Sequence, residues 1–249
     1  TTIEGQATMT LSAGHEVELE LIGTNWKKTG WNEKSLASFI APVDCSSRVA
    51  EYTGDGGGAT VKDRAGNGNN LTATDITYVN GKYGKEMSFN GSTSFAQASS
   101  PVIGTTGTVA VRWKRNRIGT AETILSNQSA STDGIRFHVD TSNNLYAVVG
   151  GSSPVSILIK SGFTDITESH TFGIKFSATS ATPFYDGAEG TAVSATQVLG
   201  LANLAIGRNQ IDSTGYASGQ GCFRVDSRIW TADEARAWSL NPISIDSRV

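Results

Sequence analysis

Apolar and polar residues alternate along many short segments of the chain, and turn residues separate these segments. Alternation of period two places successive side chains on opposite faces of a β-strand. Glycine with aspartate or asparagine marks the turns, as at Asp133-Gly134 and Asp186-Gly187. The pattern predicts an all-β fold in which two antiparallel sheets pack as a sandwich or jelly roll.

The predicted strands are short and evenly spread along the chain. They cover residues 7–11, 16–22, 86–89, 107–114, 121–126, 135–140, 144–149, 155–160, 170–176, 181–185, 204–206 and 222–230. One helix is predicted after them, because Thr231 and Glu234 form a capping box and Pro242 follows the helical segment. A further helical turn is predicted at residues 32–39. We therefore expect a small N-terminal β element at residues 1–31, a linker at 32–44 and a jelly-roll domain at 45–249.

Composition excludes several classes of function. The chain has 249 residues, a net charge of −3 and only 17% charged residues, and its basic residues are scattered. This balance predicts no nucleic-acid partner, and the absence of an 18-residue apolar run predicts no membrane span. A chain of this length buries a sizeable core without metal or disulfide staples. Cys45 and Cys222 fit either a bridge between the two ends of a domain or two buried thiols.

The segment "VKDRAGNGNN" at residues 61–70 contains the densest run of glycine and asparagine. A phosphate-binding loop is excluded, because no GxGxxG or GK[ST] motif is present and a strand-like segment follows. Two interpretations remain open. An aspartate followed by alternating glycine and asparagine supplies the oxygen ligands that Ca²⁺ takes, whereas asparagine and glycine also suit a plain turn with left-handed backbone conformations.

From about residue 45 to 242 the chain resembles laminin-G-like and concanavalin A-like lectin-glucanase jelly rolls. The matching pieces occur in order: "VKDRAGNGNNLTA", "VNGKYGKEMSFNGSTSFAQAS", "TGTVAVRWKR", "ESHTFGIKFSATSATPFYDGAEGT", "LAIGRN" and "CFRVDSRIWTADEARAWSLNP". The resemblance implies a structural Ca²⁺ between the first turn and an aspartate on the closing strand. The ligands that it implies are Asp63, Asn67, Asn69 and Asp226.

The N-terminal segment, about residues 5–30, resembles a different group of proteins. "ATMTLSAGHEVELELIGTNWKKTG" is similar to the end of phage tail-fibre and other virion stems. That resemblance implies a virion protein, trimeric through its N-terminal segment, with other virion proteins as partners and an extracellular, virion location.

No catalytic constellation is evident in the sequence. Glu16, Glu18 and Glu20 share one strand face, but they lie in the stem-like segment outside the jelly roll. His138 alternates with Phe137 and Val139 and therefore lies on the opposite face from them. We expect a protein that is not an enzyme.

The remaining candidates are ligand contacts on strands and on one long polar loop. Aromatic faces with amide, carboxylate and guanidinium groups suit carbohydrate recognition, and polar loops on a rigid scaffold commonly carry function. The predicted contacts are Arg136, Tyr146, Asn209, Gln210, Asp212 and Tyr216. Together these features predict a virion head that binds glycans or a host surface. A structural decoration protein without ligand is the alternative, and a carbohydrate-active enzyme fragment is the third candidate.

Overall fold

The structure is a computed structural model, and it describes residues 7–11, 15–22, 25–31, 45–55, 57–81 and 84–240. In the first three ranges only the backbone is described. The predicted helical turn at 32–39, the linker at 32–44 and Pro242 lie outside the described residues.

The N-terminal segment forms a three-stranded antiparallel sheet of its own, ordered β1-β2-β3. Strand β1 covers Ala7–Leu11, β2 covers His15–Ile22 and β3 covers Asn25–Trp31. The first two strands confirm the alternation. The third was not predicted, because two lysines and a glycine interrupt its apolar pattern. Pairing with β2, in which Leu21 lies opposite Trp26, accounts for it.

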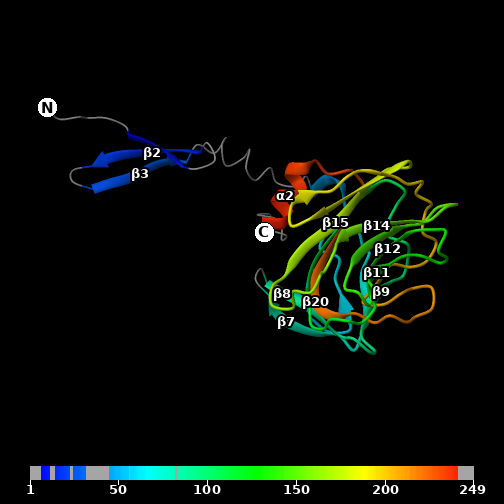
Figure 1. Cartoon of the computed structure of the whole chain (residues 1–249). Coiled ribbons are helices and arrows are strands. Elements are labelled where there is room, and N and C mark those ends of the chain that lie inside the picture. The colour runs from blue at the N-terminus through cyan, green and yellow to red at the C-terminus, as the bar shows by residue number, and fades with distance from the viewer. Residues whose placement is uncertain are drawn as a thin grey trace.

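The rest of the described chain is a sandwich of two antiparallel sheets, which appear as two layers in Figure 1. The first sheet has the order β17 (Ala188–Glu189), β16 (Ser180–Tyr185), β15 (His170–Phe176), β10 (Gly107–Arg115), β20 (Ser218–Asp226), β8 (Gly84–Asn90) and β7 (Thr77–Gly81). Two further strands attach to it: β18 (Val193–Ser194) pairs with β16, and β4 (Arg48–Tyr52) pairs with β20. A 3₁₀ turn, η1 (Cys45–Ser47), precedes β4.

The second sheet has the order β14 (Val155–Lys160), β13 (Leu145–Val149), β12 (Ile135–Val139), β11 (Glu122–Ser126), β19 (Ala205–Ile206), β9 (Phe95–Ala98), β6 (Leu71–Thr74) and β5 (Thr60–Val61). Its face toward the first sheet is apolar, and its opposite face is mixed and carries polar residues together with Leu158. The all-β jelly-roll class is therefore confirmed.

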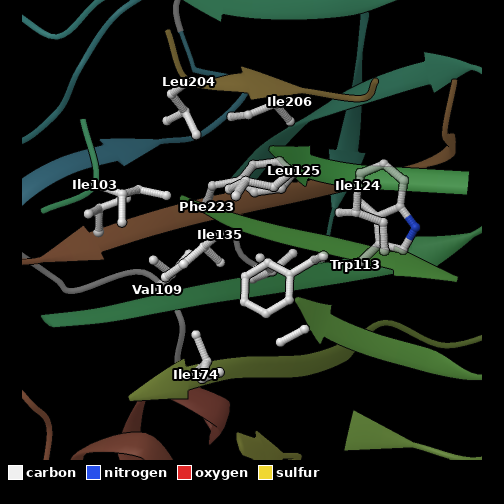
Figure 2. Packing of buried hydrophobic residues seen from close by; sticks show 14 of the residues in the cluster. Ile103, Val109, Trp113, Ile124, Leu125, Ile135, Ile174, Leu204, Ile206 and Phe223 are labelled. Atoms are coloured by element: carbon white, nitrogen blue, oxygen red, sulfur yellow. The ribbon is translucent and has the colours of Figure 1, made fainter. Parts of the chain in front are cut away.

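Buried apolar side chains from both sheets fill the space between the layers (Figure 2). Trp113 is fully buried, with its ring centroid 5.5 Å from that of Phe89 and 6.0 Å from that of Phe223. Burying an aromatic side chain of this size removes a large apolar area from water and dominates the local packing energy. The core positions follow the period-two pattern, for example Ile135, Phe137 and Val139 on β12.

Helix α2 (Ala232–Leu240) begins as the capping box predicts. The Glu234 backbone N–H donates to Thr231 Oγ1 at 3.2 Å, and the Thr231 N–H donates to Glu234 Oε2 at 2.8 Å. Trp238 of the helix packs on Trp230, with ring centroids 5.9 Å apart, and both belong to a second small core with Ala110 and Phe184. The last strand ends at Asp226 and not at residue 230, because the Trp230 N–H leaves the ladder and donates to Thr108 Oγ1.

Cys222 is a free, buried thiol, so the disulfide alternative is not found. Burial, together with the Glu86 carboxylate, raises the pKa of this thiol. Within the described residues, no helix combines the length and the apolar character needed to cross a membrane.

Candidate functional site

The outer face of strands β12–β14 carries a row of side chains that the strand register aligns. Leu158 on β14 lies opposite Tyr146 on β13, Tyr146 lies opposite His138 on β12, and His138 lies opposite Thr123 on β11. Directly opposed residues on one sheet face have Cβ atoms about 4.5–5.5 Å apart. The row is therefore a continuous strip, which we call the outer strip: Leu158, Tyr146, His138 and Thr123.

The middle of the outer strip is an aromatic platform. The rings of Tyr146 and His138 stack with centroids 5.4 Å apart and an interplanar angle of 19°. Both side chains are half-buried, and the neighbouring Leu158 is 49% exposed. A partly exposed aromatic pair beside an exposed aliphatic group can pack against the apolar face of a ligand ring.

Polar groups flank this platform on one side. Arg136 lies two residues before His138 on the same strand face, and its Nε is buried without a hydrogen-bond partner. Burial lowers the pKa of Arg136, and the nearby Asp212 carboxylate acts in the opposite direction. Gln210 Oε1 is also buried without a partner. Because buried polar atoms normally form hydrogen bonds, these atoms are candidates for ligand contacts.

Residues 207–217 form a compact loop against the same sheet. The Thr123 N–H donates to the Gly215 carbonyl at 2.7 Å, and a β-bridge joins Thr123 to Tyr216. Asn209 is 8% exposed, and its side-chain oxygen accepts from the Ile211 N–H at 3.3 Å. Asn209 therefore stabilises the loop from within and does not face solvent.

The predicted ligand contacts thus fall into two groups. The structure places Arg136 and Tyr146 on one sheet face, with Gln210, Asp212 and Tyr216 in the adjoining loop, whereas Asn209 lies inside that loop. His138 and Leu158 are not among the predicted contacts, and the strand register places them on either side of Tyr146. Alternation shows which face each residue takes, but only the register shows which residues are neighbours.

Protonation of His138 makes the stability of the folded protein depend on pH. Burial, followed by the Arg136 charge, lowers the pKa of His138 from 6.5 to about 4, while Asp140 acts in the opposite direction. A histidine whose folded-state pKa is depressed stabilises the protein above its unfolded pKa, and that stability is lost as the pH falls. We expect the free energy of unfolding to decrease between about pH 6.5 and pH 4, and the decrease to be smaller in His138→Gln. Urea unfolding at a series of pH values checks this, and identical slopes for both proteins would contradict it.

The glycine-asparagine loop at residues 61–70 is closed by the side chain of Asp63. Its Oδ1 accepts from the N–H groups of Glu51 at 3.1 Å and Ala65 at 2.9 Å, and its Oδ2 accepts from the Asn69 N–H at 3.2 Å. Gly66 and Gly68 have φ of +80° and +79°, a left-handed conformation that glycine adopts without a Cβ penalty. The loop therefore has the geometry of a plain turn.

The other predicted metal ligands have partners of their own. Asn67 Nδ2 donates to the carbonyls of Arg48 and Val49, and Asn69 Nδ2 donates to that of Val49. Asp226 lies across the β4–β20 pairing from Arg48, and its carboxylate accepts from Arg224 Nε at 2.7 Å and Nη2 at 3.1 Å.

The first and last strands of the sandwich, β4 and β20, therefore pair with each other, as the resemblance implies. In this arrangement, however, the carboxylates are engaged by hydrogen bonds. No group of three or more histidine, cysteine, aspartate or glutamate side chains suited to a metal occurs among the described residues. These residues do not fit a calcium site as they are arranged, and calcium stays a prediction whose test is given in the Discussion.

Two packed antiparallel sheets with a closing helix define a jelly-roll sandwich of the lectin-like type. Similar solved structures include domain 4 of AbnA, a GH43 extracellular arabinanase from Geobacillus stearothermophilus, in complex with arabinotriose. It is 17% identical, with a TM-score of 0.61, over 78% of this chain and 98% of that domain.

Two further similar structures are binding domains of toxins. The receptor binding domain of botulinum neurotoxin type G is 14% identical, with a TM-score of 0.58, over 78% of this chain and 51% of that domain. The binding domain of Paraclostridial Mosquitocidal Protein 1 is 13% identical, with a TM-score of 0.60, over 78% of this chain and 52% of that domain. This chain therefore spans about half of each toxin domain. At these identities the likeness shows the fold. No protein-family model matches the sequence, and no curated protein sequence matches it.

Proposed function

We propose that the sandwich is a non-enzymatic binding module that recognises a glycan through the outer strip. The stacked pair of Tyr146 and His138 is the observation that carries the proposal. A sugar ring presents an apolar face to such a platform and hydroxyl groups at its rim. Arg136 and Asp212 beside the platform supply a donor and an acceptor for those hydroxyls.

The charge state of the platform also suits a sugar. With a pKa of about 4, the His138 imidazole is neutral at neutral pH. A neutral imidazole has one donor and one acceptor nitrogen, which matches a hydroxyl group in either role. The Nδ1 atom of His138 is buried without a hydrogen-bond partner. The similar structures support the proposal, since the arabinanase domain was solved with arabinotriose and the neurotoxin domain is a receptor binding domain.

The biological setting that we propose is a virion. Its support is the resemblance of the N-terminal segment to phage fibre stems and the separate three-stranded sheet formed by β1–β3. In this proposal the N-terminal segment makes a homotrimer and contacts other virion proteins, and the sandwich is the head that binds a host-surface glycan outside the cell.

A glycan array followed by calorimetry with the strongest ligand tests the proposal. Tyr146→Ala should weaken binding by about thirtyfold, because truncating an aromatic anchor at the centre of an interface costs about 2 kcal/mol or more. Tyr146→Phe is the matched control, since it keeps the ring and removes only the hydroxyl, and it should bind within a few-fold of wild type. Binding that is unchanged in Tyr146→Ala would place the ligand elsewhere, and turnover of a polysaccharide would contradict the absence of catalysis.

The second candidate is a structural decoration protein without a small ligand. It has one observation in its favour: Ser126 and Ala205, which continue the outer face toward β9, are fully buried. Part of the face is therefore covered. A strict absence of glycan binding, together with capture of capsid or tail proteins by the intact chain, would favour this candidate.

A further inference from the structure

A groove separates the edges of the two sheets on one side of the sandwich. It has a volume of about 480 Å³, within the range of ligand sites. One wall is β14 from Ser156 to Lys160, and the other comes from β16–β18, including Tyr185, Glu189 and Val193. The outer strip lies on the face of the second sheet, whereas this groove lies beside its last strand.

Strand β14 ends its sheet, so one edge of its backbone has no partner strand in the described chain. The hydrogen-bonding pattern identifies the groups on that edge. The Gly150 N–H donates to the Gly134 carbonyl and the Asp140 N–H donates to the Asn144 carbonyl, which fixes the residues of β13 that bond to β12. Hydrogen-bonded and non-bonded pairs alternate along an antiparallel ladder. The next residues of β13, Ala147 and Val149, therefore bond to β14.

The partners of those residues on β14 are Ile157 and Val155. Their backbone groups consequently point to β13. It follows that the N–H and C=O groups of Ser156 and Leu158 point away from β13, toward the open edge. An edge that presents alternate donors and acceptors in this way is a template for another extended strand.

The groove side chains define what such a strand would carry. Ile157 is buried, and Ile159, Tyr185 and Val193 are partly buried against the main core, so the floor is apolar. Leu158, at 49% exposed, adds an apolar group at the rim. Alternate side chains of an added strand would face this floor.

Charge distinguishes one end of the groove. The Lys160 Nζ lies 5.2 Å from the centroid of the Tyr185 ring, and Lys160 forms no ion pair within the described residues. Glu189, on the opposite wall, is paired with Lys175. The end of the groove at Lys160 therefore favours a negative group on the ligand.

We propose that this groove binds an extended peptide segment of a partner protein, which adds to β14 as an antiparallel strand. The segment has apolar residues at alternate positions and an acidic residue at its N-terminal end, beside Lys160. A single strand needs less room at this edge than a second copy, because β16–β18 face β14 across the groove. Packed sheets lie about 10 Å apart, so the edge of a second copy would bring its own first sheet into the space of that wall.

Fluorescence anisotropy with the full chain and labelled hexapeptides tests this proposal. The probe is the sequence Asp-Val-Thr-Val-Thr-Val, and its controls are the same peptide N-methylated at alternate residues and a version with Lys in place of Asp. On the protein, Ser156→Pro removes one outward N–H and leaves the bonds to β13 in place. We expect saturable binding of the probe, at least tenfold weaker binding of the methylated peptide, and a similar loss in Ser156→Pro.

Lys160→Glu provides the charge control. This variant should bind the Asp peptide several-fold more weakly and the Lys peptide several-fold more tightly, and its far-UV circular dichroism should match wild type. Equal binding of the methylated and unmethylated peptides would overturn strand addition, as would no saturable binding up to millimolar concentration. Sedimentation that shows a lower oligomeric state in Ser156→Pro than in wild type would overturn the peptide as occupant in favour of a second copy.

Discussion

Replacing Glu122 by leucine should lower the free energy of unfolding by about 3–5 kcal/mol, the cost of leaving a buried charge without its counter-charge. Glu122 and Arg115 are both fully buried, and Arg115 Nε lies 3.5 Å from Glu122 Oε2. Arg117 Nε also donates to Glu122 Oε1, as does the Ser218 N–H at 3.2 Å. Urea denaturation with linear extrapolation measures the loss.

The position of Glu122 in the fold explains why the loss should be large. The carboxylate joins the end of β10 and the loop after it to the start of β20, so three segments depend on it. Burial raises the pKa of Glu122, and the hydrogen bond from Arg117 opposes that effect. Without the carboxylate, the Arg115 guanidinium keeps the bonds to Asn143 Oδ1 and the Phe163 carbonyl but has no charge partner at the Nε side.

Two controls separate this explanation from simple loss of packing. Glu189→Gln breaks a more exposed ion pair with Lys175 and should cost less than about 1 kcal/mol. The double variant Arg115→Met/Glu122→Leu replaces both charges by apolar groups and should recover much of the stability. A single variant that loses less than about 1 kcal/mol would contradict the proposed role of the pair.

Replacing Asp226 by alanine is the second change for which we expect a loss of about 3–5 kcal/mol. Its carboxylate binds Arg224 through two hydrogen bonds, both side chains are fully buried, and Ser47 Oγ donates to Asp226 Oδ1 at 3.0 Å. If Arg224 alone neutralises the carboxylate, thermal or urea unfolding should show the same loss in millimolar calcium and in excess chelator.

The same experiment decides the calcium prediction. A bound ion stabilises the folded state in proportion to the logarithm of its concentration. If chelator lowers the stability of the wild type but not that of Asp226→Ala, calcium binds at this site. The protein in solution then does not hold the Asp226 carboxylate by hydrogen bonds alone. Asp63→Asn is the matched variant on the loop, since it keeps the size of the side chain and tests the other carboxylate among the predicted ligands.

The sequence predicts the fold class well because the alternation of apolar and polar residues indicates which side of a strand is buried. Strands such as β12, β14 and β15 have five to seven residues with clear alternation or apolar runs, and their bounds are close to the predicted ones. The strands absent from the predicted set include β4, β7 and β9, which have four or five residues, and β5, β17 and β18, which have two. For the two-residue strands, pairing with neighbours and not local pattern creates the strand.

The candidate site was harder to predict than the fold, because it depends on contacts between distant segments. Residue type and strand face suggest Tyr146 and Arg136 as contacts. Their relation to Asp212 requires the loop at 207–217 to lie against the second sheet, which no local signal shows. The sequence likewise does not show that Asn209 is buried, since its place inside the loop follows from the loop's fold and not from its polar composition.

The position of β20 in the first sheet affects when this sheet can fold during synthesis. This strand pairs with β10, β8 and β4, and its Val225 lies opposite Ala50, 175 residues earlier. During synthesis β4, β8 and β10 leave the ribosome long before β20, so the first sheet lacks its joining strand until β20 has been made. Folding that waits for such a distant partner is slow. Until then, the unpaired strand edges are exposed to aggregation.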